Sequence, residues 1–193
     1  MRTVGVLALQ GAFVEHIAAL RKLGAETREI RLPEQLEGLD ALVIPGGEST
    51  TIGKLLVTFN LLKELKNLAR RGVPMFGTCA GMIVLARDTT QGYDQPLIGA
   101  MDIVVQRNGF GRQVDSFELD LPIPKLGEAP FRAIFIRAPY IEKLGEQVEA
   151  IAQLPDGRVV CARQENLLVS AFHPELTEDL RLHEYFLSMV PEH

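Results

Sequence analysis

Short apolar runs alternate with amphipathic helical patterns through the first half of the chain, and this alternation restricts the fold more than any other feature. The strand-like runs are residues 3–9, 26–31, 40–45 and 73–77. Helical spacing of apolar residues marks 12–24, 51–72 and 80–87. Strands joined by crossover helices form a parallel sheet that helices cover on both faces. We therefore predict an α/β fold with an open, mostly parallel sheet of the flavodoxin-like kind.

The second half of the chain has a different pattern, in which strands follow one another with few helices between them. Its strand-like segments are 101–108, 116–121, 131–137, 147–154, 158–164 and 167–172, followed by a helix at about 175–190. Turn sequences such as PDG at 155–157 are typical of connections between antiparallel strands. We predict that an antiparallel meander is added to the parallel sheet, and that residues 1–193 form a single domain.

Charge and cysteine content narrow the classes of function. The net charge is -5, from 20 basic and 25 acidic residues, which gives no electrostatic reason to bind nucleic acid. No apolar run is long enough to cross a bilayer, and the apolar N-terminal run is interpreted as a buried strand rather than a signal peptide. Cys79 and Cys161 are too few for a disulfide scaffold, so we expect a reducing cytoplasm.

The sequence GTCAG at 77–81 places a cysteine in a turn between a strand and a helix. It has the form G-x-C-x-G, the nucleophile elbow of α/β-hydrolases with sulfur in place of the serine oxygen. Small neighbours allow a sharp bend, and a helix start favours a thiolate. We predict that Cys79 is a nucleophile; the alternative is a small buried residue filling a tight turn. Cys161, inside a strand-like segment, is interpreted as a packing residue.

A nucleophilic cysteine needs a base and a group that orients the base. His173 follows the strand-like segment 167–172, so we expect it at the same sheet edge as Cys79. Glu175 lies two residues later, on the same side of an extended segment, and Pro174 favours extended backbone at His173. We predict that Glu175 orients His173. The alternative is that Glu175 caps the final helix and His173 is a surface residue.

The three other histidines are weaker candidates for the base. His16 and His183 lie within predicted helices, where we expect surface or partly packed side chains. His193 is the last residue of the sequence, and we expect it to be mobile. The prediction of a base therefore depends on His173.

Six motifs occur in the order found in the class I (triad) glutamine amidotransferases, which this sequence resembles over essentially its whole length. They are LALQGAFVEH, PGGESTT, FGTCAG, QRNGFGRQVDSFE, FIRAP and AFHPELTED. PGGES and GTCAG are broadly shared by amidotransferases. The narrower signals LQGA, NGFGRQVDSFE and FIRAP make the sequence most similar to the glutaminases of pyridoxal 5'-phosphate synthases.

The resemblance implies hydrolysis of L-glutamine to L-glutamate and ammonia through a cysteinyl thioester, with Cys79, His173 and Glu175 as the catalytic residues. It implies no metal and no cofactor. Backbone N–H groups of Gly47 and Ala80 are the expected oxyanion hole. The residues that the resemblance assigns to glutamine binding are Gly47, Glu48, Ser49, Arg107, Ile136 and Arg137.

The resemblance also implies a partner. In that family group the ammonia passes to a synthase subunit, within a hetero-oligomer, that builds pyridoxal 5'-phosphate for vitamin B6 biosynthesis. The sequence offers no candidate for that second chemistry. Gln10 in LQGA, beside the expected oxyanion turn, is our candidate for a contact between partner and active site.

Three other readings remain open at this stage. A glutaminase of another amidotransferase, such as imidazole glycerol phosphate synthase, would share the triad, and only the narrower motifs oppose it. A DJ-1/PfpI-like cysteine-elbow protein is disfavoured by PGGEST and by the pair of His173 and Glu175. A catalytically silent binding subunit is disfavoured by the intact triad.

Overall fold

A computed structural model describes residues 1–90, 94–111 and 115–191 of the chain. Within these residues the strands are β1 (Thr3–Leu7), β2 (Glu26–Ile30), β3 (Ala41–Ile44), β4 (Met75–Thr78), β5 (Ala86–Thr89), β6 (Met101–Gln106), β7 (Ser116–Leu121), β8 (Phe131–Ile136), β9 (Tyr140–Leu144), β10 (Glu149–Gln153), β11 (Val159–Gln164) and β12 (Leu167–Ser170). The α-helices are α1 (Phe13–Lys22), α2 (Ser49–Thr58), α3 (Leu61–Arg70), α4 (Ala80–Leu85) and α5 (Arg181–Ser188). Short 3₁₀ helices are η1 (Pro33–Leu36), η2 (Pro124–Leu126) and η3 (Pro174–Leu176).

The main sheet has the strand order β2-β1-β3-β4-β12-β11-β9-β6-β5, and β10 pairs with β11 at one side. Pairing is parallel from β2 through β12 and again between β5 and β6. The strands β11, β9, β10 and β6 are joined by antiparallel pairing. The prediction of a mostly parallel α/β sheet with antiparallel strands added is therefore confirmed.

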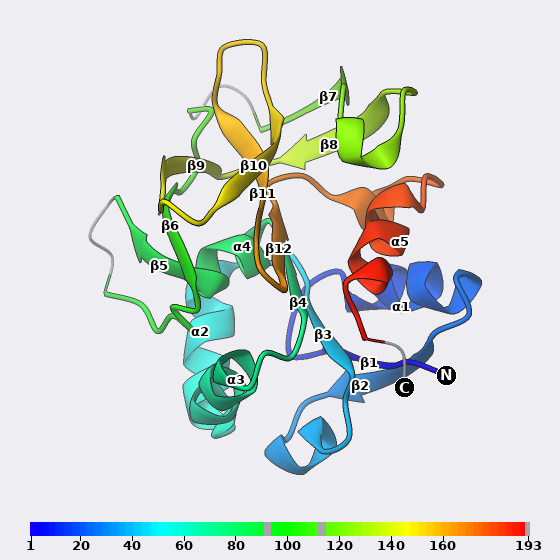
Figure 1. Ribbon diagram of the computed structural model, residues 1–193. Coiled ribbons are helices and arrows are strands. Elements are labelled where there is room, and N and C mark those ends of the chain that lie inside the picture. The colour runs from blue at the N-terminus through cyan, green and yellow to red at the C-terminus, as the bar shows by residue number, and fades with distance from the viewer. Residues whose placement is uncertain (91–93, 112–114, 192–193) are drawn as a thin grey trace.

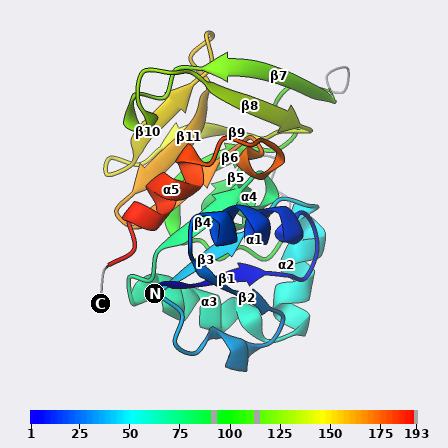
Figure 2. The same ribbon diagram turned by 90° about the vertical axis from the view of Figure 1, so that its right-hand side faces the viewer.

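Helices cover both faces of the parallel strands. In Figure 1, α2 and α3 lie on one side of β1, β3 and β4, and α1 and α5 lie on the other. Figure 2 shows α1 and α5 in front of these strands, and β7 and β8 at the top of the view. Because both faces are covered, the four residues of β3 and the four of β12 are all buried, which accounts for the apolar sequences ALVI in β3 and LLV at the start of β12.

The strands β7 and β8 form a separate two-stranded antiparallel sheet rather than part of the main one. Their core-facing side carries aromatic side chains, with Phe117 stacked on Phe135 at a centroid distance of 4.5 Å. Phe135 also contacts Phe172, which follows β12. This packing fixes the end of β8 above the carboxyl ends of the parallel strands.

Several predicted element boundaries were wrong. The predicted helix 51–72 is two helices, because Asn60 takes a left-handed conformation (φ 57°) between α2 and α3. The predicted final helix begins at Arg181 instead of 175, after η3 and a turn. The predicted helix 80–87 ends at Leu85, directly before β5, and β9 was not predicted.

No helix in the described part of the chain combines the length and the apolar character that a membrane span requires.

Candidate active site

The loops that follow β3, β4 and β12 emerge at one edge of the sheet. Ile44 at the end of β3 lies opposite Gly77 of β4, and Ser170 at the end of β12 lies opposite Thr78. Since these strands are parallel and end in register, the residues after them meet above their carboxyl ends. The three loops carry the GG turn at 46–47, Cys79 and His173.

Cys79 stands on a strained turn between β4 and α4. Its backbone has φ 52° and ψ -107°, which is unusual for a residue with a side chain. A Cβ at Gly81 would lie 1.9 Å from the carbonyl oxygen of Ile44, and one at Gly77 would lie 2.6 Å from the carbonyl oxygen of Gly81. Only glycine fits at these two positions, so the G-x-C-x-G spacing is a steric requirement of the elbow.

Cys79 and the ring of His173 both pack against Gly46. A Cβ at Gly46 would lie 3.2 Å from Cβ of Cys79, 2.7 Å from Cε1 of His173 and 3.3 Å from its Nδ1. The backbone N–H of His173 donates a hydrogen bond to the carbonyl oxygen of Ile134 in β8 (2.8 Å), which fixes the start of the loop. The predicted nucleophile and base therefore share one site.

Glu175 binds the far side of the His173 ring. Its Oε1 lies 2.6 Å from Nδ1 of His173, and both side chains are buried. Burial alone would lower the pKa of His173, but its interactions with Cys79 and Glu175 raise that pKa to about 10. The protonated form of the His173 ring is thus stabilised next to the sulfur of Cys79.

A cavity of about 1150 Å³ opens over these residues. Ten residues predicted for catalysis, glutamine binding, oxyanion stabilisation or partner contact line it: Gln10, Gly47, Glu48, Ser49, Cys79, Ala80, Arg107, Ile136, Arg137 and His173. Glu175 is not among the lining residues and lies behind His173. The carbonyl oxygen of Ile136 lies 3.9 Å from Sγ of Cys79, so the end of β8 forms one wall close to the sulfur.

The cavity wall carries charges of both signs, as binding of a free amino acid requires. Glu48 accepts hydrogen bonds from the backbone N–H groups of Thr50 (3.1 Å) and Thr51 (2.7 Å) at the start of α2. Burial opposes ionisation of Glu48, but these and the threonine hydroxyl hydrogen bonds lower its pKa to about 2. Nη2 of Arg107 lies 3.5 Å from Oε1 of Glu48.

A second charged pair on the cavity wall joins Arg137, which was predicted, to Asp115, which was not. Arg137 has a left-handed backbone (φ 44°), and its Nε lies 3.3 Å from Oδ1 of Asp115. Asp115 belongs to the NGFGRQVDSFE motif, but no pattern of residues singled it out. Residues 112–114 of that motif lie outside the described residues.

Gln10 supports the GG turn. Its Oε1 accepts a hydrogen bond from the backbone N–H of Glu48 at 2.9 Å. The same oxygen would lie 2.3 Å from a Cβ at Gly47. The amide of Gln10 is therefore packed against the backbone that is expected to form half of the oxyanion hole, whereas its contact with a partner stays a prediction.

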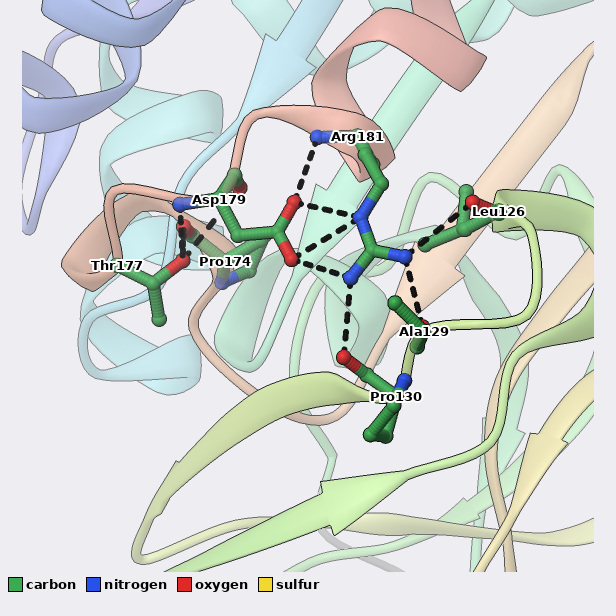
Figure 3. A network of polar contacts seen from close by, with 7 residues as sticks. All are labelled: Leu126, Ala129, Pro130, Pro174, Thr177, Asp179 and Arg181. Carbon is green, nitrogen blue, oxygen red and sulfur yellow. Dashed lines mark hydrogen bonds and ion pairs between the residues drawn. The ribbon is translucent and has the colours of Figure 1, made fainter.

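Arg181 ties the loop after the predicted triad to the segment before β8. Its guanidinium forms an ion pair with Asp179 (2.6 Å) and donates to the carbonyl oxygens of Leu126, Ala129 and Pro130, as Figure 3 shows. Asp179 also accepts from the backbone N–H of Arg181. These contacts join the loop that follows His173 and Glu175 to the segment that leads into β8.

The predictions for His16 and His183 were wrong. Both are completely buried: Nδ1 of His16 lies 2.9 Å from Nε2 of His183, and Nε2 of His16 lies 3.0 Å from Oγ1 of Thr78 and 3.4 Å from Oε2 of Glu175. Their places on the apolar faces of α1 and α5 were a signal that sequence reasoning overlooked. Cys161 is buried in β11, as predicted, and burial raises the pKa of its thiol. His193 lies outside the described residues.

Comparison with known proteins identifies the family to which this chain belongs. The SNO glutamine amidotransferase family matches residues 6–192. A solved structure described as a glutamine amidotransferase is 52% identical, with a TM-score of 0.91 over 97% of this chain and 98% of that one. A putative GMP synthase subunit from Thermoplasma acidophilum, 18% identical with a TM-score of 0.71 over 98% of this chain and 94% of its own, shares the fold. The chain belongs to the SNO glutamine amidotransferase family.

Two curated relatives with the same name are similar to this chain over nearly its whole length. A protein of Herpetosiphon aurantiacus is 61% identical over 189 residues, covering 97% of this chain and 100% of the relative. A protein of Moorella thermoacetica is 62% identical over 187 residues, covering 97% of this chain and 98% of the relative. Both relatives are named pyridoxal 5'-phosphate synthase subunit PdxT.

Proposed function

We propose that this chain is the glutaminase subunit of a pyridoxal 5'-phosphate synthase, and that it works as a single domain in the cytoplasm. The observation that carries the proposal is the placement of Cys79 and the hydrogen-bonded pair of His173 and Glu175 around one cavity. The names of the relatives support the assignment to this synthase rather than to another amidotransferase.

In the proposed reaction, the Cys79 thiolate attacks the side-chain amide carbon of L-glutamine. His173, held protonated by Glu175, gives a proton to the leaving ammonia as the tetrahedral intermediate collapses to a glutamyl thioester. Neutral His173 then takes a proton from water, which attacks the thioester and releases L-glutamate. Each tetrahedral intermediate carries an oxyanion, which needs N–H donors close to Cys79.

The oxyanion donors that we propose are the backbone N–H groups of Ala80 and Gly47. Ala80 directly follows the nucleophile at the start of α4, and Gly47 follows Gly46, against which both Cys79 and His173 pack. Gln10 packs on the Gly47 backbone, so a partner that moves Gln10 would change the geometry of this turn. We propose that docking of a synthase subunit acts here and completes the oxyanion hole.

Glutamine itself would bind along the charged wall of the cavity. Glu48 is an anion close to Arg107, and Arg137 is a cation at the mouth with 75% of its side chain exposed. Glu48 supplies charge for the α-ammonium group, and the arginines supply charge for the α-carboxylate. Backbone around Gly47, Ser49 and Ile136 would enclose the aliphatic part.

The test is glutamate release, with and without a purified synthase subunit of the matching organism. We expect weak hydrolysis by the isolated chain, strong stimulation by the synthase, and glutamine-dependent formation of pyridoxal 5'-phosphate by the complex. Addition of free ammonia to the synthase alone should replace the chain. Equal glutamate release with and without the synthase would contradict the proposed activation, and no release in either case would contradict the proposed reaction.

A further inference from the structure

Behind the triad, a chain of buried polar side chains extends from Glu175 into the core. Nε2 of His16 (α1) lies 3.4 Å from Oε2 of Glu175 and 3.0 Å from Oγ1 of Thr78 (β4). Nδ1 of His16 lies 2.9 Å from Nε2 of His183 (α5). Within the described part of the chain, Oε2 of Glu175 and Nδ1 of His183 have no hydrogen-bond partner. The reaction proposed above uses neither histidine.

Both rings are neutral. Burial, the nearby His183 and the nearby His173 lower the pKa of His16 well below its usual value, in that order. Burial lowers the pKa of His183 to about 4. The other side chains that the rings meet are Thr78, Glu175 and the aromatic ring of Phe76. Among the described groups named here, those that bring a charge to His16 are the Glu175 carboxylate and the His173 imidazolium.

Neutral rings leave two ways of placing the protons. If Nδ1 of His16 carries the proton, Nε2 turns a lone pair toward the Glu175 carboxylate, and the Nδ1–H of His183 is buried without an acceptor. If Nε2 carries the proton in both rings, His183 donates to His16, and His16 donates toward Glu175 and Thr78. A bare lone pair on Nδ1 of His183 then remains. It costs less than the first arrangement, in which an N–H is buried without an acceptor and a nitrogen lone pair faces the Glu175 carboxylate.

We propose that His16 is a positioning residue of the active site, which acts through Glu175 and is held in its Nε2–H tautomer by His183. Glu175 then has one oxygen on the Nδ1–H of His173 and the other facing the N–H of His16. A carboxylate held at both oxygens keeps its orientation toward His173 while the imidazole gains and loses its proton. Thr78, directly before Cys79, couples this chain to the elbow.

This inference rests on the proposed function, because it assigns His16 to the triad of a glutaminase. Its first test, however, needs no turnover and no variant. In ¹⁵N NMR of the histidine-labelled full chain, we expect His16 and His183 to be neutral Nε2–H tautomers between pH 5 and 8. A proton on Nδ1 of His16, or protonation of either ring near its ordinary pKa, would overturn the proposal even if glutamine hydrolysis is confirmed.

The second test compares His16→Leu with His16→Gln, whose amide N–H can face Glu175. In His16→Leu we expect the pKa of His173, read by NMR, to fall from about 10 toward its ordinary value. With the synthase present, kcat should fall about 10- to 100-fold with little change in KM, by analogy with the hydrogen-bond partners that orient metal-binding histidines. His16→Gln should restore most of both quantities.

Leu20→Ala is the matched control, since Leu20 is buried one turn later on α1 and carries no polar group. It should destabilise the same helix without moving the pKa of His173. If His16→Leu is folded and leaves the His173 pKa and kcat unchanged, His16 does not position Glu175. If Leu and Gln variants lose equal activity with an unchanged pKa of His173, the role of His16 is packing alone. If His16→Leu does not fold, the tautomer measurement decides by itself.

Discussion

Ser170 lies opposite Thr78 in the parallel pair of β12 and β4, and this register brings the loop of His173 beside Cys79. The backbone N–H of Cys79 donates to the carbonyl oxygen of Ser170 (2.8 Å), which extends the ladder by one bond into the elbow. A shift by one residue would turn each side chain to the other face of the sheet. The relative position of Cys79 and His173 therefore follows from strand pairing and does not depend on contacts between the side chains of the site.

Replacement of the nucleophile should abolish the reaction without unfolding the chain. For Cys79→Ala we expect glutamate release to fall by roughly 10³-fold or more, because no thioester can form. Cys161→Ala should keep most activity and lose some stability, because Cys161 is a fully buried packing residue in β11. Glutamate assays and thermal unfolding of both variants are the measurement, and the reverse pattern would refute the assignment of Cys79.

Glu175→Gln should separate orientation of His173 from binding of glutamine. The amide cannot accept from Nδ1–H of His173 as strongly, so we expect kcat to fall roughly 10²- to 10⁴-fold with a small change in KM. Glu178→Gln is the matched control, because Glu178 is in the same loop and is 95% exposed, in an ion pair with Lys22. Equal kinetics of Glu175→Gln and the native chain would mean that the carboxylate is not needed.

Gly46→Ala should damage activity more than stability. Its added Cβ would lie 2.7 Å from Cε1 of His173, so the ring must move away from Cys79. We expect a loss of about 100-fold in kcat/KM, as for small displacements of catalytic groups, with unfolding destabilised by about 1–3 kcal/mol. Gly38→Ala is the control, since its φ is 72° and its Cβ would meet nothing within 4 Å. A stability loss there should leave activity intact.

Stability should fall as pH is lowered from 6.5 toward 4, because of the buried histidine pair. In that window the unfolded chain binds protons at His16 and His183, whereas the folded chain does not, since the folded pKa of His183 is about 4 and that of His16 is also lowered. Each proton contributes about 1.4 kcal/mol per pH unit. The free energy of unfolding, measured with denaturant at several pH values, should change less with pH in His183→Phe than in the native chain.

Two other groups with shifted pKa values change the stability in other pH ranges, above pH 6.5 and below pH 4.5. The pKa of His173 is raised to about 10, so its stabilisation is full below 6.5 and is lost as pH rises toward 10. The pKa of Glu48 is lowered to about 2, so its stabilisation is full above 4.5 and is lost as pH falls toward 2. A free energy of unfolding that stays constant between pH 6.5 and 4.5 would therefore contradict the prediction for His16 and His183, and would not bear on His173 or Glu48.

Arg181→Met should loosen the chain around the site. The variant leaves Asp179 without its guanidinium and three carbonyl oxygens without a donor, so we expect a loss of about 1–3 kcal/mol and faster hydrogen exchange near residues 126–131. Arg132→Met is the control, because Arg132 is an exposed arginine on β8 that pairs with Glu118 and Asp120. It should leave exchange and activity unchanged; similar effects of both variants would contradict the role of Arg181.

Elements with strong local signals were predicted well, and elements that depend on distant contacts were not. The strand before Cys79 and the helix after it follow from apolar runs punctuated by glycine. The break at Asn60 did not show, because the apolar periodicity continues across it with no glycine or proline to mark the end of α2. The 3₁₀ turn at Pro174–Leu176 replaced a helix start because Glu175 points inward to His173.

The buried histidines show what periodicity could have revealed. His16 lies one turn before Leu20 on α1, and His183 lies one turn before Phe186 and Leu187 on α5, so both belong to the buried faces of their helices. Their burial was therefore predictable from spacing. Their contact with each other was not, because 167 residues separate them in the sequence.

The sequence by itself determined the succession of strands and helices, the glycine-flanked position of Cys79, and the pairing of His173 with Glu175 two residues later. These depend on local sterics and on the periodicity of apolar residues, which act over a few neighbouring positions. Tertiary structure alone decided that Cys79 and His173 both pack against Gly46, and that His16 faces the carboxylate of Glu175 from behind. Such contacts follow from the order and register of the sheet and from the packing of α1 and α5, which join residues far apart in the chain.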